Sequence, residues 1–234
     1  MPLPIFDAVS EAPVGSGVSS RTWNHTCGTL IDGCVIVCAQ ARTNTAPLNL
    51  PVLSVTYNGQ ACVRIVGQNS AALGSELWLL QNPPSGTSSV VVTWSGNIDN
   101  VATACAVSYG NVRPLNPVHI ATGDFKDAGA VAITFDISPT ISECLILDGL
   151  YQTEDTGQTV GAGQTARSNR IVTGLSTDAV AFSEEPAPAP GTVTMSWTAS
   201  AYFDYAHPVI ALAGSQLDAG DDETGDSFQF VQAP

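Results

Sequence analysis

The chain has 234 residues, of which 44% are hydrophobic and 12% charged, so it can bury a core and does not have the composition of a disordered protein. The formal net charge is −14 with a single lysine, which excludes the clustered basic residues that nucleic-acid binding needs. Val, Thr, Ile and aromatic runs lie between dispersed glycines and prolines, without a sustained apolar repeat of helical period. The sequence therefore predicts an all-β fold.

The acidic residues are concentrated late in the chain. Residues 1–113 carry a charge of −1, residues 114–214 carry −8 and residues 215–234 carry −5, which together give −14. The first half is therefore almost neutral, and the strongest acidic segment is the C-terminal one.

Residues 1–17 contain three prolines and two glycines and are predicted to form an extended N-terminal arm. Its apolar side chains, Leu3, Ile5 and Phe6, are candidates for binding a partner. The segment lacks the basic and apolar regions of a signal peptide, so we expect synthesis in the cytoplasm without a classical export signal. No apolar run approaches the ~20 residues that cross a bilayer, so we expect no membrane association.

The first β-sandwich is predicted over residues 18–113. Its expected strands are residues 21–25, 31–41, 52–57, 61–66, 76–80, 90–95 and 101–109. Asn58-Gly59 between two of them is the signature of a type I′ hairpin turn. Seven short strands separated by turns are typical of a sandwich or a jelly roll.

A repeated pattern indicates a second domain of the same kind over residues 114–214. A Pro/Gly turn leads into an alternating strand that ends at Trp94, and the same arrangement returns at Trp197. Counting back from the tryptophans, Val90 matches Val193 and Val92 matches Met195, so both strands should bury the same face. We therefore predict two tandem β-sandwich domains, jelly-roll or Ig-like, divided near the prolines at 114–117. The second domain's strands are expected at residues 131–137, 144–150, 166–173, 179–183, 192–198 and 208–213.

Residues 215–234 are predicted to form an acidic C-terminal arm. Asp221, Asp222 and Glu223 belong to its acidic part, and Phe228 and Phe230 to an alternating apolar end that could add to a sheet edge. The acidic spacing fits neither an EF-hand loop nor a calcium-binding nonapeptide, which favours a segment that faces solvent or a partner over a calcium site.

No residue pattern points to catalysis, a cofactor or a metal. The three histidines have no nucleophile-elbow motif beside them, and His25 is interpreted as a hydrogen-bonded residue at a sheet edge. Cys34 and Cys38 lie on one face of a strand, roughly 13 Å apart, which is too far for a disulfide. All six cysteines are expected to be reduced core residues without zinc. The sequence thus predicts a non-enzymatic protein.

Three single features of the sequence have alternative interpretations. The adjacent acids at 154–155 and 184–185 could serve glycoside hydrolysis, although adjacent loop acids are common on surfaces. The glycine-rich residues 161–166 do not lie in a strand-to-helix turn that would bind a dinucleotide. The four tryptophans could form a sugar platform, but the alternation places Trp94 and Trp197 inward, which favours core packing.

Several motifs resemble a β-sandwich family found in virion proteins of tailed bacteriophages. They are Trp23-x-His25-Thr26, the apolar residues 34–39, the segment 54–61, the segment 76–86 with its two prolines, and the valine-rich strand to Trp94. The resemblance covers residues 20–112 and extends more loosely over 161–167 and 191–197. It implies a structural role on the virion surface, as a head decoration or cement protein or as part of a tail fibre, and it supplies no catalytic residues.

The expected function is accordingly that of a capsid decoration or cement protein. Its expected partner is the major capsid protein of the same virion, and a homo-oligomer, favoured as a trimer, is expected on the virion surface. The alternatives are a tail-fibre or carbohydrate-binding module, which predicts exposed aromatic side chains, and a polysaccharide hydrolase, which predicts two opposed carboxylates in a groove.

Overall fold

The computed structural model describes residues 2–44, 51–69, 72–154, 157–173 and 177–215; within these, residues 127–131 and 201–203 are described by their backbone alone. The described residues form strands, turns and bends without a helix, so the all-β prediction is confirmed. No helix capable of spanning a bilayer occurs among them.

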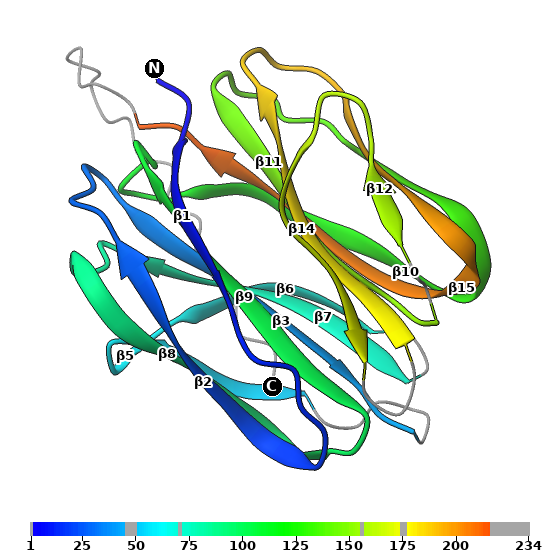
Figure 1. The fold of residues 1–234 in the computed structure, drawn as a ribbon. Helices are drawn as coiled ribbons and strands as arrows, with labels where there is room; N and C mark the ends of the chain where they lie inside the picture. The colour runs from blue at the N-terminus through cyan, green and yellow to red at the C-terminus, as the bar shows by residue number, and fades with distance from the viewer. Residues whose placement is uncertain (1, 45–50, 70–71, 155–156, 174–176, 216–234) are drawn as a thin grey trace, which may run out of the picture.

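The described residues form fifteen strands, which Figure 1 shows in their spatial arrangement. In the first half they are β1 (Ile5–Glu11), β2 (Val18–Cys27), β3 (Cys34–Arg42), β4 (Val52–Tyr57), β5 (Gln60–Ala61), β6 (Val63–Asn69), β7 (Leu73–Gln81), β8 (Gly86–Ile98) and β9 (Val101–Gly110). In the second half they are β10 (Val118–Ile137), β11 (Cys144–Gln152), β12 (Gln158–Val160), β13 (Thr165–Thr173), β14 (Thr177–Ala187) and β15 (Val193–Ala213).

The strands pair antiparallel in three sheets. The central sheet has the order β1-β9-β3-β7-β6, and the first outer sheet has the order β2-β8-β4-β5. The third sheet has the order β10-β15-β11-β14-β13, with β12 added to β15. Figure 1 shows the central sheet lying between the other two. The two orders correspond strand by strand: β1, β9, β3, β7 and β6 of the central sheet occupy the same places as β10, β15, β11, β14 and β13 of the third sheet.

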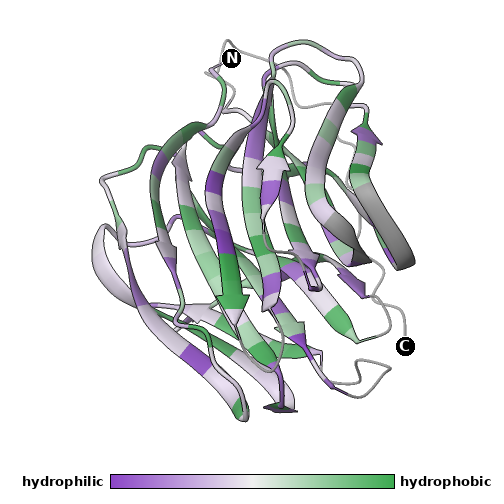
Figure 2. Ribbon diagram, turned by 45° about the vertical axis from the view of Figure 1, so that its right-hand side comes forward, coloured by the Kyte–Doolittle hydropathy of each residue, from purple (hydrophilic) through white to green (hydrophobic). Residues whose placement is uncertain are grey.

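The central sheet is covered on both faces, which explains its nearly uninterrupted burial along β3, β7 and β9. Val35, Val37 and Trp78 face the first outer sheet, where Val90, Trp94 and other side chains form the core. The opposite face carries Ile36, Leu77 and Val107, which pack on the third sheet. A sheet buried on both sides needs apolar residues in succession, whereas β8 keeps the alternation of a half-buried strand. Figure 2 shows the resulting apolar bands across the strands.

Two long strands bend over the third sheet. Residues 118–126 of β10 pair with residues 205–212 of β15, and residues 132–137 pair with 193–198, with shifts of register between the two stretches. The second stretch packs over the sheet itself: Met195 lies in a core with Ile146 and Val209, and Ile133 and Trp197 lie in a core with Leu150. The short strands expected at 131–137, 192–198 and 208–213 are therefore parts of two continuous strands.

Buried polar side chains also join the central and third sheets. Tyr109 Oη donates to Glu184 Oε2 (2.8 Å), and Arg42 Nη1 pairs with Asp178 Oδ1 (2.6 Å). The approach is close at Gly149, where a Cβ atom would stand 2.4 Å from Cys38 Sγ. The two halves of the chain are therefore packed through a continuous apolar and polar contact.

The predicted N-terminal arm differs from the observed structure. Residues 1–17 were expected to be an extension outside the sheets, but β1 is the edge strand of the central sheet and pairs with β9 from Ile5↔Gly110 to Glu11↔Cys105. The reason is that its partly alternating side chains fit one edge of a sheet whose two faces are already covered. Glu11 also reaches the third sheet, where Ser168 Oγ donates to its Oε1 (2.6 Å) and Arg170 Nε lies 3.2 Å from its Oε2.

Other predictions are confirmed. Asn58 and Gly59 both have positive φ (50° and 73°), as a type I′ turn requires, and they join β4 to β5. The two matched strands bury most of the expected side chains, namely Val90, Val92, Trp94, Met195 and Trp197. All six cysteines are free and buried.

Candidate functional site

A groove of about 300 Å³, lined by both apolar and polar residues, opens beside the beginning of β1. It lies between β1, the loop from β2 to β3, and the end of β9. Ile5 is 58% exposed and Ile31 is 76% exposed, the largest value among the exposed large apolar side chains of the described residues. The lining residues are Ile5, Phe6, Asp7, Thr29, Leu30, Ile31, Gly110 and Asn111. The groove therefore offers apolar surface to another molecule or segment.

The loop that forms one wall is fixed on both sides by backbone hydrogen bonds. Asn111 N donates to Ile31 O (2.9 Å), and Val112 N donates to Asp32 O (2.8 Å). Asp32 has a φ of 48°, and Gly33 lies so close to Leu30 that a Cβ atom would stand 2.6 Å from Leu30 Cβ. The tight turn holds Leu30 and Ile31 at the rim.

A series of hydrogen bonds, most of them partly buried, starts at Asp7 in the wall of the groove. Asp7 Oδ2 accepts from Gly28 N (3.0 Å) and from Ser108 Oγ (2.6 Å). Ser108 Oγ lies 3.1 Å from His25 Nε2, and His25 Nδ1 lies 2.9 Å from Ser10 Oγ. Trp23 Nε1 donates to Ser10 Oγ (3.0 Å). These hydrogen bonds link β1 to β2 and β9.

The direction of these bonds follows from the protonation of His25. Burial lowers the pKa of His25 to about 4, although the nearby Asp7 carboxyl acts in the opposite sense. The ring is therefore neutral near pH 7 and carries one N–H. The hydroxyl of Ser108 donates its hydrogen bond to Asp7, so it accepts one from Nε2–H of His25. Nδ1 of His25 then accepts from Ser10. Both ring nitrogens of His25 and both serine hydroxyls thus have hydrogen-bond partners. These bonds are structural, and the prediction that His25 is a hydrogen-bonded residue of an edge strand is confirmed.

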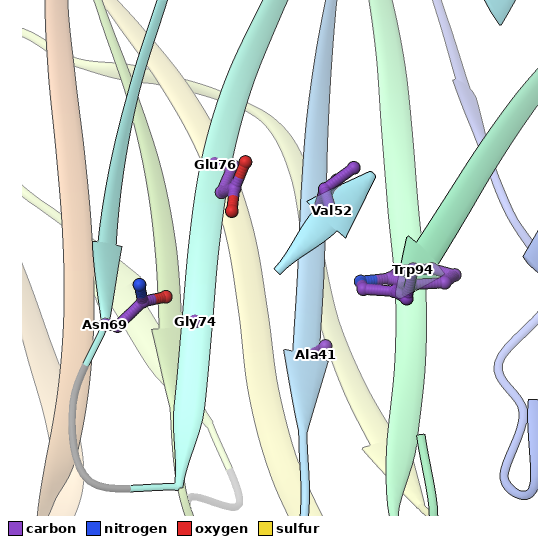
Figure 3. A pocket seen from close by; sticks show the side chains of 7 residues that line it. Ala41, Val52, Asn69, Gly74, Glu76 and Trp94 are labelled. Atoms are coloured by element: carbon purple, nitrogen blue, oxygen red, sulfur yellow. The ribbon is translucent and has the colours of Figure 1, made fainter. Parts of the chain in front are cut away.

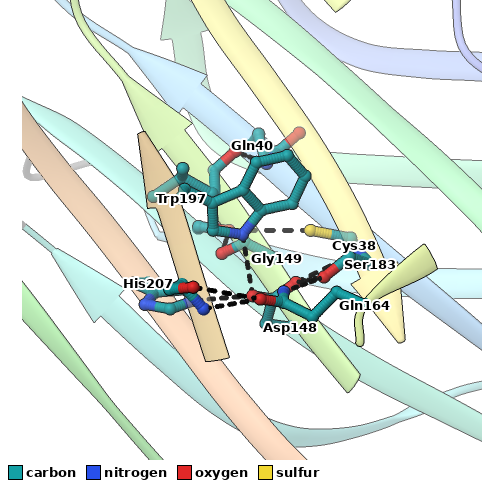
Figure 4. A network of polar contacts seen from close by, with 11 residues as sticks. Cys38, Gln40, Asp148, Gly149, Gln164, Ser183, Trp197 and His207 are labelled. Atoms are coloured by element: carbon teal, nitrogen blue, oxygen red, sulfur yellow. Dashed lines mark hydrogen bonds and ion pairs between the residues drawn. The ribbon is translucent and has the colours of Figure 1, made fainter. Parts of the chain in front are cut away.

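A second buried network lies within the third sheet (Figure 4). Asp148 accepts from Ser183 N and Oγ, from Trp197 Nε1 (2.8 Å) and from His207 Nε2 (2.8 Å). Asp148, Ser183 and His207 are fully buried. The serine hydroxyl donates to the aspartate and not to the histidine, so this is not the hydrogen-bond order of a nucleophile, a base and an orienting acid. The network holds β11, β14 and β15 together.

A much smaller pocket lies between the central and first outer sheets (Figure 3). Its volume is about 10 Å³, which is roughly the space of one water molecule. Glu76, Asn69 and Trp94 contribute to its wall. Trp94 Nε1 is buried without a hydrogen-bond partner in the protein. The pocket is too small for a substrate.

The structure divides the predicted partner-binding residues into three groups. Ile5 lies in the groove and is exposed, and Leu3 is half-buried just before β1. Phe6 also lines the groove, but its ring packs within the chain against Tyr109 and Arg167. Asp221, Asp222, Glu223, Phe228 and Phe230 lie outside the described residues.

Leu30, Ile31 and Asn111 were missed as site residues by the sequence analysis. Ile31 was expected to begin a strand over 31–41, but β3 begins at Cys34, so Leu30 and Ile31 lie in the loop before it. The turn residues Asp32-Gly33 directly after them were the available signal. Asn111 carried no such signal. It comes to the groove only because the end of β9 passes the loop.

The carboxylates and tryptophans considered for hydrolysis or sugar binding make contacts within the protein. Glu184 pairs with Arg167 and accepts from Tyr109, while the neighbouring Glu185 projects to the opposite face of β14, so they do not form an opposed catalytic pair. All four tryptophans are buried, which leaves none of them to form a sugar platform. Among the described residues, no group of three or more His, Cys, Asp or Glu side chains is placed to hold a metal ion.

Comparison of the chain with protein families, with curated proteins and with solved structures finds no match.

Proposed function

We propose that the protein is a non-enzymatic structural protein of a bacteriophage virion, a capsid decoration or cement protein that binds the shell of the major capsid protein. The observation that carries the proposal is the groove beside β1, where two apolar side chains, Ile5 and Ile31, are exposed on a strand and a loop that hydrogen bonds hold in place. A partner can bury Ile5 and Ile31 there while β1 and the loop keep their positions, and each side chain would contribute about 1.5–3 kcal/mol to binding.

The packing of the two halves supports a structural role. The matching strand orders of the central and third sheets favour two tandem sandwiches of one topology, joined through their inner sheets. Pairs such as Tyr109–Glu184 and Arg42–Asp178 cross that junction, so a load on one half is transmitted to the other. A cement protein needs such a body because it must resist deformation while it bridges capsid subunits. The sequence resemblance to phage virion proteins points the same way.

The proposal includes a location on the virion surface and a homo-oligomer, favoured as a trimer. Neighbouring copies would dock through the same exposed surfaces at points where capsid subunits meet. The acidic character of the chain favours a basic docking surface on the shell, so binding should weaken as salt screens the attraction.

The test is binding to purified shells that lack this protein. Ile31→Asp places a charge in the groove and should lower shell affinity at least about tenfold, since a desolvated charge opposes apolar docking. Leu53→Asp is the matched control, because Leu53 is also an exposed apolar residue (67%) but lies on β4 of the first outer sheet. Equal binding of the two variants and the unaltered protein would overturn the groove as the attachment site. Failure of the unaltered protein to bind any such shell would overturn the function.

A further inference from the structure

We propose that, in the free protein, residues 228–231 of the same chain occupy the groove beside β1. The occupant is the apolar end of the C-terminal segment, which lies outside the described residues. The inference rests on the groove and on the place where the described chain ends, and it holds whether or not the eventual partner is a capsid.

The described chain ends at the wall of the groove. Ser215 N donates to the carbonyl oxygen of Asn111 (2.7 Å), and Asn111 is one of the lining residues. Just before it, Gly214 passes so close to the start of the chain that a Cβ atom would stand 2.2 Å from Pro2 O. The C-terminal segment therefore starts beside the groove and next to the residues that lead into β1.

The length of the segment allows it to return. Phe228 follows Ser215 by 13 residues, which could span roughly 40 Å at ~3.3 Å per residue. The groove adjoins Ser215, so the intervening residues have ample slack. A segment tethered at this distance has an effective concentration in the millimolar range, which favours it over the same segment of a second copy.

The residue pattern suits the apolar side chains that are exposed at the groove. In an extended backbone Phe228 and Phe230 project to one face, and Gln229 projects to the other. The exposed side chains of Ile5 and Ile31 provide an apolar surface for the two rings. A volume of about 300 Å³ is at the lower limit for ligand pockets, so it suits a few side chains better than a folded element.

The charge of the intervening residues is compatible with this path. Asp218, Asp221, Asp222, Glu223 and Asp226 follow Ser215 closely. Arg113 lies beside the exit, since its backbone N donates to Ala213 O (2.9 Å). Its guanidinium donates to the carbonyl oxygens of Leu115 and Asn116, which leaves its positive charge without a carboxylate in those bonds. The acidic segment therefore begins next to a positive charge, which favours its contact with the body at this point.

The experiment uses the full chain with a reporter thiol at the groove. Thr29→Cys places it on an exposed polar lining residue, and the six native cysteines are buried and react slowly. Its labelling rate with a maleimide is compared in three backgrounds: the unaltered segment, Phe228→Asp with Phe230→Asp, and the control Ser227→Asp with Gln229→Asp. The control adds the same charge on the opposite face of the segment.

The phenylalanine variant should react at least about tenfold faster than the unaltered chain, and the control should stay within about twofold. Equal rates in all three backgrounds would overturn the proposal. Protection that is lost on dilution would also overturn it, because the occupant would then be the segment of a second copy. Shell binding is measured separately, so loss of binding in Ile31→Asp without protection by the segment would overturn this inference and leave the proposed function standing.

Discussion

The guanidinium of Arg167 lies over the ring of Phe6, with 3.7 Å between Cζ and the ring centroid. Phe6 belongs to β1 and Arg167 to β13, so the contact joins the first strand of the chain to the third sheet. Tyr109 meets the same ring edge-on at 6.2 Å, and Glu184 accepts hydrogen bonds from both Tyr109 and Arg167. The pKa of Tyr109 is raised by burial and by this carboxylate. The first strand is thus a structural part of the junction between the halves.

Phe6→Ala should lower the free energy of unfolding by roughly 2 kcal/mol, since it removes a partly buried ring and its cation–π contact. The measurement is urea denaturation followed by fluorescence. Ile5→Ala, at the exposed neighbouring position, is the control and should change stability by less than about 0.5 kcal/mol. Equal effects of the two substitutions would contradict the role assigned to Phe6.

The two matched tryptophans should respond differently to replacement by phenylalanine. Trp197 Nε1 donates to the buried Asp148, whereas Trp94 Nε1 has no partner in the protein. Trp197→Phe should therefore be more destabilising than Trp94→Phe by about 1–3 kcal/mol, the cost of leaving a buried acceptor without one of its donors. Replacement of either tryptophan by alanine should cost roughly 3–5 kcal/mol. Denaturation of the four variants side by side is the test, and a smaller loss for Trp197→Phe would refute the assignment.

Stability should depend on pH through His25. Its pKa falls from 6.5 to about 4 on folding because burial disfavours the charged ring. Between these two values the unfolded chain binds more protons than the folded one, so stability decreases as pH falls from 6.5 to 4 and this contribution then levels off. His25→Gln removes the titrating group. The stability advantage of the unaltered protein over this variant should shrink across the same window, and a constant difference from pH 7 to 4 would rule out the shift.

The cysteines should all titrate as thiols. Under denaturing, non-reducing conditions a thiol reagent should find all six, and in the native protein it should react slowly because each is buried. Burial also raises the pKa of Cys62 to about 12, which further reduces its thiolate fraction. Recovery of four or fewer thiols would show that a disulfide forms.

The local features of the strands could be read from the sequence because they depend on neighbouring residues. The alternation before Trp94 and Trp197 gave the buried faces, and Asn58-Gly59 gave a turn with positive φ at both positions. The contribution of β1 could not be read in the same way. The strand has a clear apolar side only in the neighbourhood of Phe6. The ring of Phe6 packs against Tyr109 on β9 and Arg167 on β13, about 100 and 160 residues away in the sequence.

The groove was partly predicted, through Ile5, but its other walls were not. It is assembled from three segments whose sequence positions lie far apart, and no local pattern in Asn111 announces its place beside Ile31. The long strands β10 and β15 were also missed, because the alternation of a strand does not show that it bends from one layer to the next. Pairing with a partner that bends at the same place determines their length.

The common strand order of the central and third sheets has a consequence for folding. Each strand of one sheet has a counterpart in the other, so a nascent chain could place β11 where β3 belongs, or exchange counterparts between two molecules. One difference between the two halves is local: β8 and β9 are separated by the bend at Asp99 and Asn100, whereas β15 is continuous through the equivalent stretch. The fraction of molecules that reach the native strand pairing would then depend on how early in folding β8 and β9 come together around residues 99 and 100.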